Sequence, residues 1–231
     1  PSLYEAETES ARRIRTMMDA SPLGSSKLAV EKFERENHLT LAEKQKEAVQ
    51  KALESGVLVI TGGPGTGKTT LVQAIIAAAR QFELKVRLMA PTGRAAKRLS
   101  LSSGVEADTI HKALEAELHD SGRTFFNRNE SDPLKEDLII VDEASMMDIS
   151  LFYHLLCALK EGARLILVGD IDQLPPVGPG SPLKDLIEWG EVPVVRLEHI
   201  FRQKEGSGII DNAARIREGE LCYPDEQGEF S

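Results

Sequence analysis

Residues 61–70 combine glycines, a lysine and threonines at the spacing of a loop that binds phosphate. The segment reads Thr-Gly-Gly-Pro-Gly-Thr-Gly-Lys-Thr-Thr, and its glycines let backbone amides turn inward around an anion. Lys68 supplies a positive charge for the β- and γ-phosphates of a nucleotide, and Thr69 supplies a hydroxyl for Mg²⁺. We therefore predict a nucleotide site here. Its expected ligands are Gly63, Pro64, Gly65, Thr66, Gly67, Lys68, Thr69 and Thr70.

The surrounding pattern predicts the elements that position this loop. An apolar run at 57–60 precedes it and is typical of a strand buried on both faces. A helical pattern follows it, starting at Lys68. This context disfavours the alternative, a glycine-rich turn that matches the spacing by chance.

Strands and helices alternate along the rest of the chain. Further strands are predicted at 86–90, 138–141, 165–168 and 192–197. Helices are predicted at 68–82, 93–101, 109–118, 149–159 and 182–189, and an exposed excursion at 120–136. The alternation is typical of an α/β fold with a parallel sheet covered by helices on both faces. In such a sheet, ligands bind beyond the carboxyl ends of the strands.

Two adjacent carboxylates, Asp142 and Glu143, directly follow the strand predicted at 138–141. Asp142 is placed to hold the water shell of Mg²⁺, and Glu143 could orient and deprotonate the water that attacks the γ-phosphate. The alternative is an acidic helix N-terminus, where carboxylates are favoured anyway. The nearby phosphate loop favours the catalytic interpretation.

Polar side chains also follow the next two predicted strands. Gln173 could reach a γ-phosphate or its attacking water, although its segment is also typical of a turn rich in glycine, aspartate and proline. Arg202 would bring a guanidinium to the ligand edge, where such a group accelerates phosphoryl transfer by about 10³- to 10⁵-fold. A solvated or salt-bridged surface arginine is the alternative for Arg202.

The amino-terminal part is predicted to be helical. Apolar residues keep helical spacing over 1–20, a link of Ser, Pro and Gly follows at 21–26, and a charged helix is expected at 27–36. Thr40 is the expected N-cap of the next helix, because Glu43 follows it by three residues. Gln45 shares the apolar face of that helix.

Composition limits the class of protein. The 231 residues carry a formal net charge of −9, which argues against coating nucleic acid through bulk attraction. A local basic track remains, with six basic residues and one acid between Arg80 and Arg98. The two cysteines show no metal-ligand spacing. No membrane span or signal peptide is apparent, so a cytoplasmic location is expected.

Seven motifs in order resemble the first motor domain of RecD-like superfamily 1 DNA helicases, the exodeoxyribonuclease V alpha-subunit family. They are Gln45, the phosphate loop, Ala-Pro-Thr-Gly-Arg-Ala-Ala-Lys-Arg-Leu at 90–99, Thr-Ile-His at 109–111, Asp-Glu-Ala-Ser at 142–145, Gly-Asp-Ile-Asp-Gln-Leu-Pro-Pro at 169–176 and Phe-Arg-Gln at 201–203. The resemblance covers residues 3–220. It implies a RecA-like P-loop domain that uses ATP and Mg²⁺.

The resemblance implies a role for each nucleotide-site residue. Gln45 would read the adenine edge, and Lys68 and Thr69 would bind phosphate and metal. Asp142 and Glu143 would be the metal and water carboxylates. Gln173 would sense the γ-phosphate and couple it to DNA, and Arg202 would be the arginine finger.

Single-stranded DNA is the partner that the resemblance implies. Its backbone contacts would be Pro91, Thr92, Gly93, Arg94, Lys97, Thr109 and His111. The residues themselves support part of this set, because a helix that opens at Thr92 offers amides to phosphate and Arg94 and Lys97 add charge. A solvated helix face is the alternative.

The implied organisation is a helical segment and link at 1–26, a motor domain at 27–220, and the start of a further region at 221–231. A second motor domain of the same parent chain is expected, so this piece alone should unwind DNA weakly or not at all. The implied activity is 5′-to-3′ translocation on single-stranded DNA. Whether the parent acts alone or with the subunits of a nuclease complex stays open.

Other functions share some of these motifs. The helicase portion of a conjugative relaxase is similar, although the nuclease-like Tyr or His cluster that would distinguish it is not seen here. An ATP-dependent switch or binding module without translocation is the hypothesis from another class. A small-molecule kinase is the third hypothesis, because it shares the phosphate loop. Such enzymes, however, rarely carry Asp-Glu followed by Gly-Asp-x-x-Gln at successive strand ends.

Overall fold

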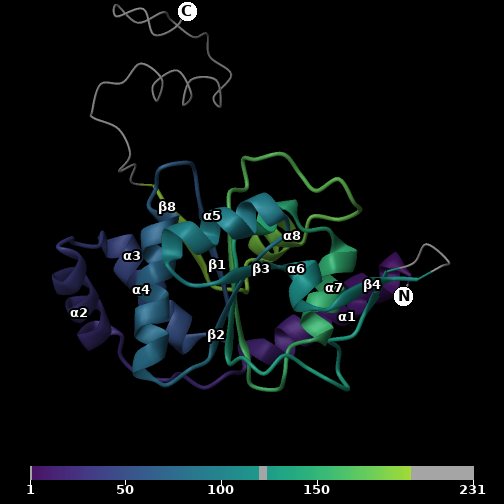
Figure 1. The fold of residues 1–231 in the computed structure, drawn as a ribbon, viewed down its shortest axis with the longest axis horizontal. Coiled ribbons are helices and arrows are strands. Elements are labelled where there is room, and N and C mark those ends of the chain that lie inside the picture. The colour runs from purple at the N-terminus through teal and green to yellow at the C-terminus, as the bar shows by residue number, and fades with distance from the viewer. Residues whose placement is uncertain (1, 120–123, 199–231) are drawn as a thin grey trace, which may run out of the picture.

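Six parallel strands form the central sheet, in the order β3-β2-β6-β7-β1-β8 (Figure 1). This computed structural model describes residues 2–119 and 124–198. The strands are β1 (Val57–Gly62), β2 (Val86–Ala90), β3 (Ala107–Thr109), β6 (Leu138–Val141), β7 (Arg164–Gly169) and β8 (Val194–Leu197). The predicted α/β fold with a parallel sheet is confirmed.

Helices cover both faces of this sheet, as predicted. They are α1 (Leu3–Met18), α2 (Lys27–Asn37), α3 (Glu43–Glu54), α4 (Lys68–Gln81), α5 (Gly93–Ser103), α6 (Ile110–Ala113), α7 (Ile149–Cys157) and α8 (Pro182–Trp189). Alternate side chains of each strand point to opposite faces. Leu58 and Ile60 therefore join a core with α2, α3, α4 and α5, whereas Val57 and Val59 join a second core with α1, α6, α7 and α8. Figure 1 shows α2, α3 and α4 on one side of the strands and α1 and α7 on the other.

The register of the strands aligns their carboxyl ends. The pairs nearest these ends are Ala90↔Thr109, Met89↔Val141, Val141↔Leu167, Thr61↔Gly169 and Gly62↔Leu197. Segments that follow β1, β2, β3, β6 and β7 therefore start from one edge of the sheet.

The predicted helix at 109–118 is wrong in its second half. Helix α6 ends at Ala113, and Glu115 adopts a left-handed φ of 52°, which turns the chain out of the helix. Residues of β4 (Ala116–Leu118) then pair antiparallel with β5 (Thr124–Phe126). Strand β5 lies in the excursion predicted at 120–136. Much of the described part of this excursion is exposed, although Leu134 is buried and its N–H donates to the Ala158 carbonyl at 2.8 Å.

Two further differences concern short-range signals. Helix α3 begins at Glu43 with Ala42 as its N-cap, so the prediction that Thr40 caps it is wrong. The Gln45 side chain accepts a hydrogen bond from the Ala42 N–H at 2.9 Å and serves that end of the helix instead. Strand β3 was not predicted, because its three residues include Asp108 and lack an apolar run.

Helix α1 packs into the same molecule as the sheet. A capping box between Ser2 and Glu5 starts the helix. Its buried residues Ala6 and Ile14 belong to the core that covers β1 and β7. The division into 1–26, 27–220 and 221–231 stays a prediction, and the last of these segments lies outside the described residues. In the part that the structure describes, no helix is both long and apolar enough to cross a membrane.

We expect Ile14→Ala to lower the free energy of unfolding by about 2–5 kcal/mol, because it leaves a cavity at a fully buried position between α1 and the sheet. Urea unfolding of the chain measures this. Leu3→Ala, on the same helix but 51% exposed, is the matched control and should change stability by no more than about 0.5 kcal/mol. Equal effects of the two substitutions would show that α1 is not part of the core.

Candidate functional site

The phosphate loop connects the end of β1 to the start of α4. Gly67 is the N-cap of α4 and has a φ of +79°, a conformation that glycine adopts without strain. A Cβ on Gly62 would lie 2.8 Å from both the Leu197 carbonyl oxygen and Thr66 Oγ1. The loop therefore packs closely against β8. The backbone amides at the N-terminus of α4 face the pocket beside the loop.

Lys68 lies within this loop. Its Nζ donates hydrogen bonds to the carbonyl oxygens of Gly62 at 2.5 Å and Gly63 at 2.9 Å. Burial lowers the pKa of the Lys68 ammonium, while the Asp170, Asp142 and Glu143 carboxylates act in the opposite direction. A partly buried cation beside three carboxylates suits a ligand that combines an anionic group with a metal ion, since an anion alone would be repelled by the carboxylates.

Asp142 and Glu143 start the turn after β6. The Asp142 backbone N–H donates to the Met89 carbonyl at 2.9 Å, which continues the sheet pairing. Burial raises the pKa of the Asp142 carboxyl, opposed mainly by a hydrogen bond from the Glu143 backbone. Glu143 adopts a left-handed φ of 54°, an uncommon conformation for a residue other than glycine.

Arg98 on α5 forms an ion pair with Glu143 Oε1. The second carboxylate oxygen, Oε2, is buried and has no hydrogen-bond partner among the described residues. Arg98 belongs to the basic track seen in the sequence, but its role at this carboxylate was not predicted. Only the folded chain brings the two residues together, because they lie 45 positions apart.

These groups meet around one pocket of about 350 Å³. Its lining residues are Pro64, Gly65, Thr66, Gly67, Lys68, Thr69, Thr70, Arg98, Ser102, Asp142, Glu143 and Gln173. The structure thus brings the predicted phosphate, metal, water and sensor residues into one cavity. Arg202, the predicted arginine finger, lies outside the described residues.

Asp170 is a further acidic residue at this edge of the sheet. The sequence predicted only a turn for the segment that contains it. Its side chain is 4% exposed, and it accepts a hydrogen bond from the Asp172 N–H at 3.1 Å. The Gln173 N–H donates to the Asp170 carbonyl at 3.3 Å, so this turn positions Gln173 at the pocket. The available signal was its place directly after a buried strand, as for Asp142.

Gln45 lies beneath the phosphate loop rather than in the pocket lining. Its side chain is 3% exposed, and its Nε2 donates to the Gly67 carbonyl at 3.4 Å. Together with its bond to Ala42, this contact ties the start of α3 to the N-cap of α4. Reading of an adenine edge by Gln45 stays a prediction.

The predicted DNA-contact residues lie at the same sheet edge, beyond β2 and β3. Thr92 caps α5 by accepting from the Ala95 N–H at 3.3 Å, and Thr109 caps α6 by accepting from the Lys112 N–H at 3.1 Å. A Cβ on Gly93 would lie 4.0 Å from the Thr109 methyl group, so the two helix starts adjoin. Pro91 and Thr92 are half-buried, and Gly93, Arg94, Lys97 and His111 are exposed.

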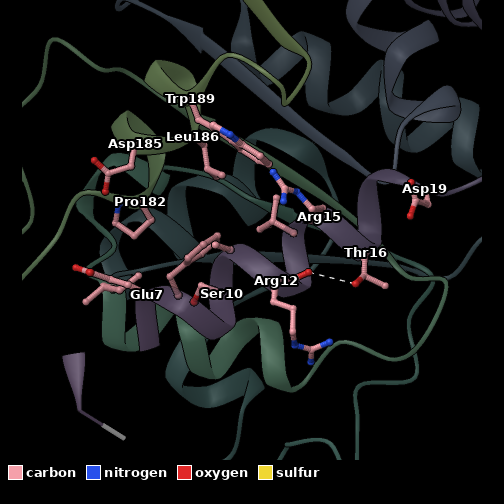
Figure 2. Close-up of a pocket in the computed structure, with 14 residues that line it drawn as sticks. Glu7, Ser10, Arg12, Arg15, Thr16, Asp19, Pro182, Asp185, Leu186 and Trp189 are labelled. Carbon is pink, nitrogen blue, oxygen red and sulfur yellow. Dashed lines mark hydrogen bonds between the residues drawn. The ribbon is translucent and has the colours of Figure 1, made fainter. Parts of the chain in front are cut away.

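A larger pocket of about 670 Å³ lies elsewhere, between α1, α7 and α8 (Figure 2). Its lining is mainly apolar, and the Arg15 guanidinium lies 5.5 Å from the centre of the Trp189 ring. It shares no lining residue with the phosphate-loop pocket. The larger cavity is therefore separate from the residues that could act on a phosphate.

Comparison with known proteins agrees with this geometry. Residues 40–225 match a family model described as an AAA domain. The chain belongs to this family. A protein of Deinococcus radiodurans named ATP-dependent RecD2 DNA helicase is 39% identical over 223 residues, which cover 95% of this chain and 30% of that protein. The RecBCD enzyme subunit RecD of Mycolicibacterium smegmatis is 36% identical over 204 residues, which cover 78% of this chain and 36% of the subunit.

Solved structures give the same result for the fold of this AAA domain. The Pif1 helicase of Candida albicans superimposes with a TM-score of 0.54 at 26% identity, covering 79% of this chain and 45% of that chain. The resemblance to RecD-like helicases and the RecA-like fold are thereby confirmed. The AAA domain spans about a third of the length of the two curated relatives.

We expect Asp142→Asn to make the AAA domain more stable at pH 7. Its folded-state pKa is raised above the usual 3.8, so the folded state binds the proton more tightly than the unfolded state. Stability therefore falls as the pH rises through the window between 3.8 and the folded-state pKa, and the asparagine removes this loss.

Thermal unfolding of both proteins from pH 4 to pH 8 measures the effect. The gain should shrink as the pH approaches 4, and the exposed-site control Glu161→Gln should show no such pattern. A variant less stable than the wild type by the same amount at every pH would contradict the expectation.

Proposed function

We propose that this AAA domain is the ATP-hydrolysing motor domain of a DNA helicase, with Mg²⁺·ATP in the phosphate-loop pocket and single-stranded DNA along α5 and the start of α6. One observation supports this proposal most directly. The phosphate loop, the Asp142 and Glu143 carboxylates and Gln173 line one cavity, and this cavity lies at the same sheet edge as the basic, exposed start of α5. That arrangement suits a domain that links nucleotide state to DNA contact.

The lining of the pocket suits a nucleoside triphosphate and its bound metal ion. Its wall includes the amide-rich start of α4 and the Lys68 ammonium, both of which suit phosphate oxygens. No group of three or more His, Cys, Asp or Glu that could hold a metal occurs among residues 2–119 and 124–198. A cation here would need phosphate oxygens as ligands, which is the usual way in which Mg²⁺ binds with one or two carboxylates.

Bound Mg²⁺·ATP would supply the γ-phosphoryl group and neutralise charge on its oxygens. Thr69 and Asp142 are the residues that would hold the metal. Glu143 would accept a proton from the attacking water at its buried Oε2. Lys68 would offset phosphate charge, and Gln173 would orient the γ-phosphate or the water.

The whole-protein activity is a further part of the proposal. The names of the curated relatives, ATP-dependent RecD2 DNA helicase and RecBCD enzyme subunit RecD, support helicase activity of the parent. A second motor domain in the parent rests on the resemblance alone. The names also suggest nuclease-complex subunits as partners of the parent. Movement in the 5′-to-3′ direction and the finger role of Arg202 rest on the resemblance alone.

We expect single-stranded DNA to stimulate ATP hydrolysis by the full-length protein that contains this domain, because both sites share one edge of one sheet. Phosphate release with oligo(dT), with duplex DNA and without DNA measures it. Lys68→Ala is the control and should lower hydrolysis by about 10²- to 10³-fold in every case. Hydrolysis without any stimulation would favour the ATP-dependent switch, and survival of hydrolysis in Lys68→Ala would refute the loop assignment.

Glu143→Gln should keep nucleotide affinity close to that of the wild type while lowering turnover by about 10²- to 10⁴-fold, because the amide cannot accept the proton of the attacking water. Titration with a fluorescent ATP analogue and single-turnover hydrolysis separate the two effects. Equal loss of binding and turnover would indicate that Glu143 supports the pocket rather than the reaction.

A further inference from the structure

Arg98 lies between the proposed DNA-contact surface and the phosphate-loop pocket. It belongs to α5, whose start carries the proposed DNA contacts, and it also lines the phosphate-loop pocket. Its side chain is 64% exposed, whereas that of its partner Glu143 is only 12% exposed. A long, solvent-accessible cation thus reaches from the DNA side of the domain to the carboxylate proposed to activate water.

The ion pair holds one oxygen of Glu143 and leaves the other free among the described residues. Oε1 accepts from the Arg98 guanidinium, and the buried Oε2 has no partner there. A charge-assisted hydrogen bond fixes the orientation of a carboxylate more firmly than a neutral one. The backbone of Glu143 is also in a sparsely populated conformation, with a φ of 54°. Its orientation therefore depends on Arg98.

The same guanidinium is available to DNA. Arg94 and Arg98 are four residues apart on α5, so they share one face of the helix, about one turn apart. Both are exposed. A guanidinium binds carboxylate and phosphate with the same planar donors. A DNA phosphate near Arg94 would lie within reach of Arg98 and would compete with Glu143 for it.

We propose that Arg98 is a positioning residue that is exchanged between Glu143 and the backbone of single-stranded DNA. Without DNA it restrains Glu143, and DNA draws the guanidinium away and frees the carboxylate to orient water. The inference rests on the proposed function. By linkage, whatever DNA binding does to Glu143 must be matched by an effect of Glu143 on DNA affinity.

This reciprocity gives a test that needs no hydrolysis. Glu143→Gln in the full-length protein should tighten binding of fluorescein-labelled oligo(dT) about two- to fivefold, the range of one exposed ion pair. Arg98→Gln should flatten the slope of log affinity against log salt by about 0.7, as for one lost phosphate contact on a single strand. Arg98→Gln should weaken binding, and the gain from Glu143→Gln should vanish when the two substitutions are combined.

Two matched controls isolate the pair. Glu161→Gln removes the same charge at an exposed carboxylate outside the phosphate-loop pocket, and should leave DNA affinity nearly unchanged. Arg94→Gln removes a cation from the same helix face, and should weaken DNA binding equally with and without Glu143→Gln. An equal gain in affinity from Glu161→Gln, or a gain from Glu143→Gln that persists without Arg98, would overturn the exchange.

Hydrolysis supplies the second measurement. Arg98→Gln should raise the DNA-independent rate and reduce the ratio of stimulated to basal rate, while Arg98→Lys should retain part of that ratio. A fall in rate with and without DNA would overturn the inference and would assign Arg98 to the phosphate. A wild-type protein with neither DNA binding nor hydrolysis would refute the proposed function as well, whereas normal wild-type behaviour with no coupling would refute only the exchange.

Discussion

The parallel register of the central sheet is the constraint on which the site depends. The central strands β1, β6 and β7 are buried on both faces and have apolar interiors, so their polar groups gather where the strands end. Because all six strands run the same way, those ends meet at one edge. Lys68, Asp142 and Asp170 come from separate stretches of chain and interact there. An antiparallel strand in the middle of this sheet would send its polar end to the opposite edge.

The same edge concentrates charge in a poorly solvated place. Burial lowers the pKa of Lys68 and raises the pKa of Asp142, so each group is held in an environment that disfavours its charged form. The neighbouring charges compensate one another only in part. Such an arrangement reduces the stability of the fold but prepares the pocket for a ligand that brings both negative charge and a metal.

Sequence reasoning succeeded where a pattern was local and strong. The strand at 86–90 and the helix at 182–189 have the predicted bounds, because apolar periodicity and a proline start are local signals. It failed at β4, where helical spacing continues but antiparallel pairing with β5 prevails. It also could not assign Arg98 to Glu143, since an ion pair between distant segments leaves no mark in the spacing of either.

Helix α5 is what connects the two proposed binding surfaces. Its buried face carries the small residues Ala95 and Ala96, which pack with Ala90 at the end of β2 and bring the helix close to the sheet edge. Its other face carries the cations. A DNA phosphate bound at Arg94, in the first turn of this helix, would therefore lie about one turn from Arg98. The proposed coupling between nucleotide chemistry and DNA then requires no distant relay, only two basic residues one turn apart on the exposed face of α5.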